Sequence, residues 1–396
     1  MSWQLAVGSW QSAKKNRVSR LTSHVSRFTI LNRSLVIGHW SKKNRISRFT
    51  SHVSCLTFHV SRFTIFYLLS SIFFFSSCKN HKPDISKVIV DLKVERFEND
   101  LFSLDAAKRD SGIHDLINRY GDFFFFYFND YAHHWRMQND SSHLWKDSVV
   151  AYIADPTLHA LYDSVENKFS DISSIQKQLT TSLRYFKFYF PQITIPEIIT
   201  LINGPGHGAF TYGDSTLCIA LDDYMGQNFS YYKFENMPEY LVWRFRSEYI
   251  VPNCMQVMIT HEFTFDPSGK KLLDAMIYNG KVLYLRSQVM PDAPDSLVTS
   301  FREKDLKWCN ENEKEIWKFF ITRNLLYSQD PLEYLKYVND GPTTSGMPNE
   351  SPGNVGSWVG WRIVTAYMKR NPEIPLKQLM SEQDAQKILT DSKYKP

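Results

Sequence analysis

The pair His261-Glu262 comes closest in residue type to a catalytic motif. Zinc peptidases place two histidines four residues apart on one helix face and use the intervening glutamate as general base toward a zinc-bound water. Phe265 stands here where the second histidine belongs, and Asp266 falls one residue too far along to replace it on that face. Because a catalytic zinc normally has three protein ligands, the sequence favours a structural or vestigial His-Glu pair without metal.

Two further features have the residue types of a site. His207 or Asp274 would add a ligand if the fold brought it beside His261, so a zinc-dependent envelope hydrolase that uses His261-Glu262 is the alternative to a non-enzyme. Glycines recur at 204, 206 and 208, but no Lys-Ser/Thr follows and the spacing is not that of a dinucleotide loop, which indicates a structural turn. The adjacent His133 and His134 diverge on a helix, so we interpret them as the rim of an aromatic core block, residues 123–128.

Cys78 indicates a different chemistry, covalent lipid attachment. It follows an apolar run, residues 63–75, and two small residues, Ser76 and Ser77, which is the form of a lipoprotein export signal. The run is too short for a bilayer span, which needs roughly 20 apolar residues. Phe75 occupies the position where such signals usually carry Leu. We expect a signal at 63–78, acylation of Cys78, and a domain at 79–396 outside the cytoplasm.

The segment before this signal has the composition of a non-structural leader. Residues 14–30 recur with a short insertion as residues 42–65, and no Asp or Glu precedes Asp84. We expect residues 1–62 to be a non-structural basic repeat that precedes the true start of translation, because the start codon is called too early and translation begins near the signal. Residues 78–396 hold 35 basic and 41 acidic residues, a net charge of −6. This negative net charge argues against binding to nucleic acid, which needs a basic face, and against a polybasic contact with anionic lipid.

Periodicity predicts a mainly helical α+β domain with a small sheet. Alternating apolar residues at 88–94 predict a strand, and Ile-rich runs at 193–202 and 216–221 predict two more. Asp155-Pro156 predicts a helix start, and residues 173–189 a second helix ended by Pro191. From Met237 onward the pattern is mainly helical, with one helix from near Ser357 to Asn371 and a capping box, Ser381 with Asp384, for the last.

The remaining cysteines and a Gly/Trp cluster are interpreted as core. Cys218, Cys254 and Cys309 allow one disulfide plus a free thiol, but buried free thiols are the favoured reading. The cluster Gly356-Trp358-Gly360-Trp361 suits helix packing through small residues, with a partner-binding surface as the alternative.

Several blocks together resemble the gliding-motility lipoprotein family called GldB. They follow one another in order through the part after Cys78, at residues 186–204, 217–226, 270–285, 315–330, 351–372 and 384–396. The family is similar in outline to zinc-dependent peptidases, whose metal-binding helix falls where residues 261–265 fall here. The incomplete ligand set implies that the fold persisted without the chemistry.

The resemblance implies a lipoprotein anchored at Cys78 and required for gliding, in bacteria whose motility machinery is bound up with type IX secretion of adhesins. It implies other gliding-machinery proteins as partners, no cofactor and no small-molecule substrate. Residues 79–81 lack the acidic residues of a surface-export tag, so a periplasm-facing position is expected. A periplasmic ligand-binding lipoprotein, with a pocket lined by exposed aromatics, is the other alternative.

Overall fold

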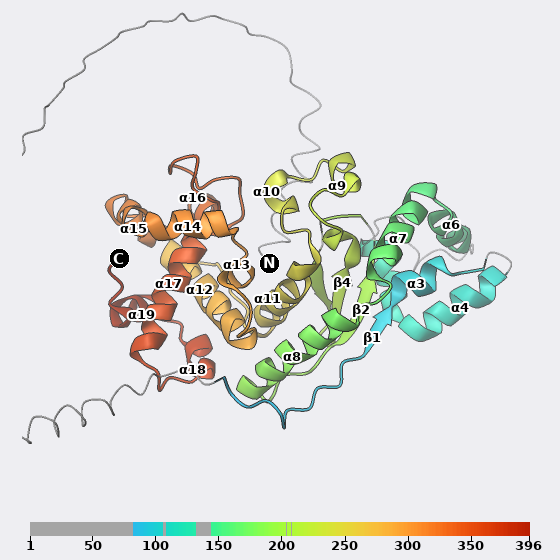
Figure 1. Cartoon of the computed structure of the whole chain (residues 1–396), viewed down its shortest axis with the longest axis horizontal. Coiled ribbons are helices and arrows are strands. Elements are labelled where there is room, and N and C mark those ends of the chain that lie inside the picture. Colours follow the sequence, from blue (N-terminus) through green and yellow to red (C-terminus); the bar gives the residue numbers. More distant parts are fainter. Residues whose placement is uncertain (1–81, 106–107, 132–143, 203, 207) are drawn as a thin grey trace, which may run out of the picture. The chain divides into compact units, whose positions relative to one another are not determined.

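A small mixed sheet organises the first half of the domain (Figure 1). The computed structural model describes residues 82–105, 108–131, 144–202, 204–206 and 208–396. Within these residues the sheet has the strand order β1-β2-β4-β3, and its strands are β1 (Val94–Arg96), β2 (Glu197–Leu201), β3 (Ala209–Tyr212) and β4 (Thr216–Ala220). β1, β2 and β4 are parallel, whereas β3 pairs antiparallel with β4 at one edge.

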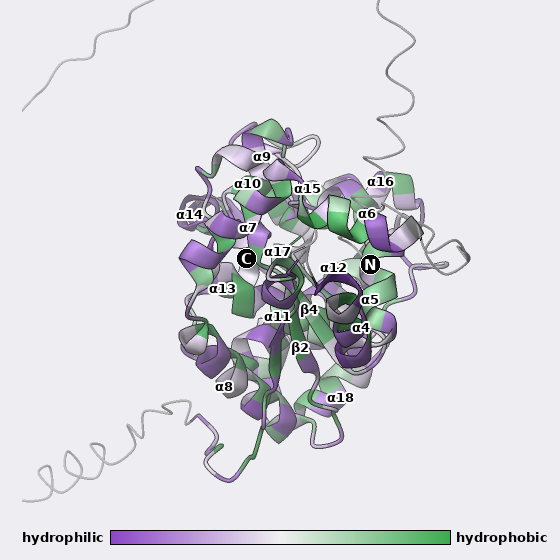
Figure 2. Ribbon diagram, turned by 90° about the vertical axis from the view of Figure 1, so that its right-hand side faces the viewer, coloured by the Kyte–Doolittle hydropathy of each residue, from purple (hydrophilic) through white to green (hydrophobic). Residues whose placement is uncertain are grey.

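The two central strands are buried on both faces. In β2 and in β4 every residue after the first is buried, and both are continuous apolar runs apart from Thr200. This pattern is typical of parallel strands covered by helices on both sides. Figure 2 shows the hydrophobic residues concentrated along β2 and β4. The predicted strands at 193–202 and 216–221 are therefore confirmed in place, although the hydrogen-bonded parts are shorter.

Helices make up most of the rest of the described chain, so the expectation of a predominantly helical α+β fold is confirmed. Their bounds are α3 Phe97–Phe102, α4 Arg109–Tyr120, α5 Asp122–Phe126, α6 Leu144–Ile153, α7 Pro156–Phe169, α8 Ser173–Tyr189, α9 Ser230–Phe234, α10 Glu239–Val242, α11 Ile250–Glu262, α12 Leu272–Val289, α13 Asp295–Thr299, α14 Glu303–Glu311, α15 Glu313–Thr322, α16 Pro331–Val338, α17 Val355–Arg370, α18 Leu376–Ser381 and α19 Ala385–Ser392. Short helical turns lie at Tyr127–Tyr131, Leu221–Tyr224 (η5), Ser247–Tyr249 and Leu325–Tyr327.

Helices α7 and α8 form where the sequence predicts them. Asp155 caps α7, because its Oδ1 accepts hydrogen bonds from the backbone N–H groups of Thr157 (2.8 Å) and Leu158 (3.0 Å), with Pro156 at the first helical position. Helix α8 spans the predicted residues and ends two residues before Pro191. In Figure 1, α7 lies to the right of β4, and α8 lies below α11, which it contacts.

The strand predicted at 88–94 is wrong for all but its last residue. Strand pairing begins where Ile198 N–H donates to Lys93 O (2.9 Å), and only Val94 belongs to β1. Side chains of α8 take the carbonyls that a ladder would need: Arg184 donates to Val88 O (2.8 Å) and Gln176 donates to Leu92 O (3.0 Å). The apolar alternation therefore belongs to a segment that is hydrogen-bonded to side chains of α8 and not to a neighbouring strand.

The second half of the described chain is a helical assembly built on α12 and α17, which make the most extensive helix–helix contact in this part of the molecule. Trp358 is fully buried, and Gly356 and Gly360 sit where any side chain would meet a neighbouring backbone. The reading of this cluster as packing is thus confirmed for these residues, whereas Trp361 is partly exposed. Helix α17 begins at Val355, two residues earlier than predicted.

The capping box predicted for the last helix is wrong in one partner. Asp384 alone caps α19, since its Oδ1 accepts from Lys387 N–H (2.9 Å). Ser381 ends the preceding helix, α18, and its hydroxyl donates to Gln378 O (3.0 Å). Ser381 therefore belongs to the end of α18 and Asp384 to the start of α19, so the two residues do not form one capping box.

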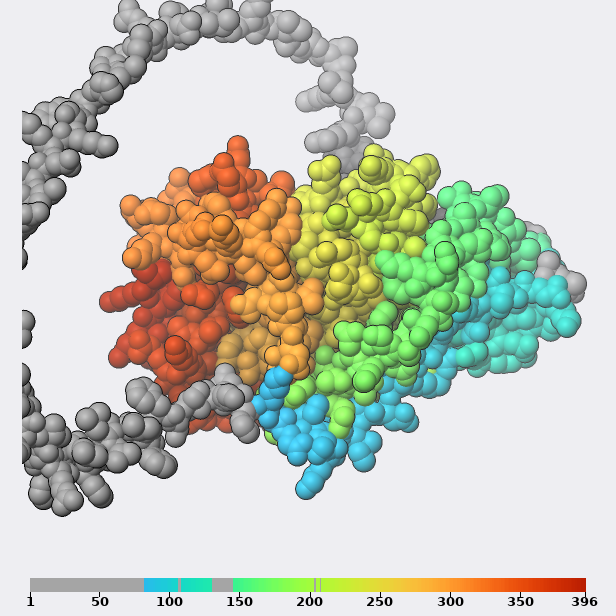
Figure 3. Space-filling view, viewed as in Figure 1, coloured from blue at the N-terminus to red at the C-terminus, as the bar shows by residue number. Residues whose placement is uncertain are grey.

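The described residues from Pro83 to Pro396 pack into one compact unit. In the space-filling view the cyan and green segments, the yellow segments and the orange and red segments follow one another from right to left (Figure 3). Phe123, Phe124 and Phe128 are buried, as predicted for the aromatic block. Within this described part, no helix has the length and apolar character needed to cross a bilayer.

Candidate functional site

Two loops meet at the carboxyl ends of the parallel strands β2 and β4, the edge where sheets of this kind usually hold their sites. The loop after β2 carries Gly204, Gly206 and Gly208 with φ angles of 90°, 122° and 60°. Such positive φ angles favour glycine. The loop after β4 is the short helical turn η5, which carries Asp222 and Asp223. Because β2 and β4 are adjacent, the sheet brings the glycines and the aspartates together.

The backbone of the glycine loop binds the two carboxylates. Gly204 N–H donates to Asp222 Oδ2 (2.6 Å) and Gly206 N–H donates to Asp223 Oδ1 (2.6 Å). Gly208 N–H donates to Asp223 Oδ2. Both aspartates are buried, with relative exposures of 0% and 1%. Backbone donors of this kind supply the partners that a buried carboxylate needs. We name these five residues the Gly–Asp cluster.

Tyrosines surround the Gly–Asp cluster and are themselves hydrogen-bonded. Tyr127 O–H donates to Ile202 O (2.5 Å) at the end of β2, and its oxygen lies 2.8 Å from the Tyr152 hydroxyl. Tyr232 O–H donates to Asp222 O (2.7 Å). Burial raises the pKa of Tyr152 and of Tyr232 well above the usual range, so both hydroxyls stay protonated at physiological pH. They act as structural donors here.

Helix α11 reaches this edge through Asn253 in its first turns. The Asn253 amide donates to the Tyr224 hydroxyl (3.0 Å), and that hydroxyl lies 3.4 Å from where a Cβ on Gly208 would be. Lys168 of α7 donates to Tyr224 O (2.9 Å) from the other side. Contacts from α7 and α11 therefore hold η5 and the glycine loop in one arrangement.

His261 and Glu262 lie elsewhere, at the far end of α11. Both are exposed, and Glu262 is the last residue of the helix. Phe263 caps the helix end, so Phe265 is not on the helix at all. The expectation that residues 261–265 form one turn of a peptidase-like helix is therefore wrong: the chain leaves the helix before the fourth position.

Among the residues that the structure describes, no set of metal ligands surrounds His261. Its Nε2 lies 3.9 Å from Oδ1 of Asp214, whose side chain is fully exposed. Asp274, a suggested additional ligand, instead accepts from Lys271 N–H (2.8 Å) at the start of α12. Across the described ranges, no group of three or more His, Cys, Asp or Glu side chains has metal-binding geometry. His207, His133 and His134 fall outside those ranges.

The cysteines of the described part are free and buried, which confirms the favoured reading. Cys218 lies on β4, Cys254 on α11 and Cys309 on α14. Burial raises the pKa of Cys254 to about 12, so its thiol is neutral and unreactive at physiological pH. Cys78, the predicted lipidation site, and the predicted signal and leader lie outside the described residues.

The Gly–Asp cluster was missed at the level of sequence, although a signal for it exists. Asp222-Asp223 directly follows a buried apolar strand, and the glycine repeat directly follows the neighbouring one. Carboxyl ends of parallel strands share one edge, so the pairing of β2 with β4 implies the contact. That pairing is not encoded locally, because the antiparallel strand β3 intervenes in sequence.

The described residues define a predominantly helical α+β protein with a small mixed sheet and with a carboxyl edge stabilised by internal hydrogen bonds. A scan of family models matches residues 78–396 to the gliding motility protein GldB. The match covers most of the chain, and the protein belongs to this family of gliding motility lipoproteins. No curated protein and no solved structure matches the chain.

Proposed function

We propose that this protein is a non-catalytic assembly or stabilising component of the gliding machinery, anchored by lipid at Cys78, facing the periplasm and linked to type IX secretion. The observation that carries the proposal is the extent of the family match, which begins at residue 78 and runs to residue 396. The first matched residue is thus the cysteine that the sequence marks for acylation.

The distance between anchor and domain supports a position close to the membrane. Only residues 79–82 separate Cys78 from the compact unit that begins at Pro83. Five peptide steps span at most about 18 Å, from roughly 3.3–3.6 Å per residue. A lipid with two or three acyl chains gives durable anchoring, whereas a single chain is marginal. The domain therefore acts within a short reach of the membrane that receives the lipid.

The internal bonding of the sheet edge supports a role other than catalysis. Asp222 and Asp223 are bound by backbone N–H groups of the same chain, and Tyr232 donates to a backbone carbonyl. His261 stands at an exposed helix end, 3.9 Å from a fully exposed aspartate. A general base or metal ligand needs partners that converge on a reacting atom. These groups instead stabilise the domain, which suits a protein that presents surfaces to partners.

The experiment that tests the function is deletion of the gene followed by complementation. We expect the deletion strain to stop spreading on agar, and the wild-type gene to restore spreading. The double variant His261→Ala/Glu262→Gln restores it equally if the pair has no chemistry. Normal spreading of the deletion strain contradicts the gliding role. Failure of the folded double variant to restore spreading contradicts the non-catalytic part alone.

A further inference from the structure

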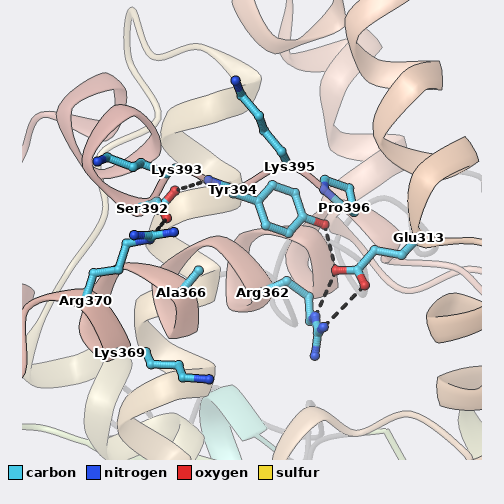
Figure 4. A pocket seen from close by; sticks show the side chains of 10 residues that line it. All are labelled: Glu313, Arg362, Ala366, Lys369, Arg370, Ser392, Lys393, Tyr394, Lys395 and Pro396. Carbon is cyan, nitrogen blue, oxygen red and sulfur yellow. Dashed lines mark hydrogen bonds and ion pairs between the residues drawn. The ribbon is translucent and has the colours of Figure 1, made fainter.

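A basic pocket lies between α15, α17 and the end of the described chain (Figure 4). Its volume is about 510 Å³. Its lining residues are Glu313, Arg362, Ala366, Lys369, Arg370, Ser392, Lys393, Tyr394, Lys395 and Pro396. Five of these side chains are cationic and Glu313 is the acidic one. The positive charge is notable because residues 78–396 carry a net charge of −6.

The inner wall of the pocket is fixed by a three-residue network. Arg362 donates two hydrogen bonds to the Glu313 carboxylate, from Nε (2.9 Å) and from Nη2 (3.2 Å). Tyr394 O–H donates to the same carboxylate (2.9 Å), and its ring packs edge-on against Trp317 at 5.2 Å. Two-pronged contacts of this kind hold an arginine in one geometry. Glu313, the acidic side chain of the lining, is therefore already bound by Arg362 and Tyr394.

Within the described part of the chain, the other cations of the lining have no acidic partner. Arg370 donates through Nε to Ser392 O (2.9 Å), which ties the end of α17 to the end of α19. Lys369, Lys393 and Lys395 are exposed, and among the described residues no carboxylate lies within ion-pair distance of them. Figure 4 shows Lys395 above the Glu313–Arg362 pair, Lys393 to its upper left and Lys369 to its lower left. Arg362 is paired with Glu313. Four cationic side chains of the lining then remain: Lys369, Arg370, Lys393 and Lys395.

We propose that this pocket binds a phosphate-bearing ligand. Lysines are point-charge phosphate binders, and an arginine with nitrogens left over adds directional donors. A cavity of this volume accommodates a phosphate together with a polar body of headgroup size. The phosphate has two sources, a free soluble phosphate or the headgroup of a membrane lipid. The inference stands on the pocket and does not rest on the proposed gliding role.

The test measures binding to the mature lipidated protein, purified in detergent and in phosphate-free buffer. Isothermal titration uses inorganic phosphate in one arm and glycerophosphoglycerol, a deacylated lipid headgroup, in the other. The pocket variant is Lys369→Gln/Lys393→Gln/Lys395→Gln, which leaves the Glu313 network intact. The matched control is Lys177→Gln/Lys233→Gln/Lys304→Gln, which removes three exposed lysines elsewhere on the domain.

We expect saturable binding of at least one probe, weakened at least tenfold in the pocket variant and unchanged in the control. Tighter binding of glycerophosphoglycerol identifies a lipid headgroup as the source, and tighter binding of inorganic phosphate identifies a free anion. Absence of saturable binding of either probe at millimolar concentration overturns the proposal. Equal losses in the pocket variant and the control overturn it as well, because the effect is then one of net charge.

Discussion

Gly280 of α12 and Gly360 of α17 lie backbone against backbone. A Cβ on Gly280 would overlap the carbonyl carbon and oxygen of Gly360, and a Cβ on Gly360 would overlap the carbonyl of Met276. The two helices are therefore close enough that only glycine fits at either position. Because α12 and α17 make the most extensive helix–helix contact of the C-terminal half, this approach sets the geometry of that half.

Substituting Gly360 by alanine is expected to destabilise the protein strongly. The new methyl group meets backbone, which cannot rotate away, so we expect a loss of about 2–3 kcal/mol or more in the free energy of unfolding. Gly341→Ala is the control, since its Cβ would meet a neighbour at 3.4 Å, an ordinary contact. Urea unfolding of both variants measures the difference. Equal stability of Gly360→Ala and the wild type would show that the helices are not so tightly packed.

The Gly–Asp cluster predicts a second stability effect. Asp223→Asn replaces one of the two carboxylate oxygens, which accept from the Gly206 and Gly208 N–H groups, by an NH2 group that donates and cannot accept. Hydrogen bonds to buried charged groups contribute about 1.5–3 kcal/mol each, so we expect a loss on the order of 3 kcal/mol. Asp214→Asn, at a fully exposed side chain, should change stability by less than about 0.5 kcal/mol. Comparable effects of the two substitutions on the unfolding midpoint would refute the structural role.

Lys281 predicts a pH dependence of stability. It is buried in α12 and donates to Met380 O (3.2 Å) and Glu382 O (2.8 Å), and its burial lowers the pKa to about 8. Between pH 8 and about 10 the unfolded chain holds this proton and the folded chain releases it. The free energy of unfolding therefore rises with pH in this window.

The variant Lys281→Met isolates that effect. From pH 7.5 to pH 9.5 the wild type is expected to gain up to about 2 kcal/mol from this group, and the variant is expected to lose that gain. Lys177→Met, at an exposed lysine, should keep the wild-type slope. Denaturant unfolding at the two pH values measures all three proteins. An unchanged slope in Lys281→Met would mean that another group is responsible.

The exposed His261-Glu262 pair is expected to hold no zinc, and metal analysis of the purified protein checks this. The mature protein is expected to contain far less than one zinc per chain after purification without chelator. His261→Ala is expected to change the free energy of unfolding by less than about 0.5 kcal/mol, because the side chain is exposed at a helix end. One equivalent of zinc, lost in His261→Ala, would make hydrolysis the working hypothesis.

Local signals predicted the helices better than the strands. Asp155-Pro156 and Pro191 fix the ends of α7 and α8 through capping and the missing proline N–H, which are properties of neighbouring residues. The segment at 88–93 alternates like a strand, yet Arg184 and Gln176 of α8 donate to two of its carbonyls, Val88 O and Leu92 O. That competition comes from residues about a hundred positions away, which no local pattern contains.

The candidate sites show the same division. The position of His261 followed from where α11 ends, at Glu262, and no capping signal in the sequence marked that end. The basic pocket combines residues from α15, α17 and the last residues of the chain. Its charges come together only through the packing of α19 against α17. The sequence therefore shows each charged residue, but it does not show that these residues line one pocket.

The most direct test of a lipid-anchored gliding protein is single-cell gliding of a deletion strain that carries Cys78→Ser, measured together with membrane fractionation. Cys309→Ala, which removes a free cysteine of α14 and leaves the predicted lipoprotein signal unchanged, is the cysteine control. We predict that Cys78→Ser abolishes incorporation of labelled palmitate, releases the protein from the membrane fraction and stops gliding, while Cys309→Ala keeps its lipid and glides normally. Wild-type gliding speed with an unlipidated, soluble Cys78→Ser protein would contradict the account.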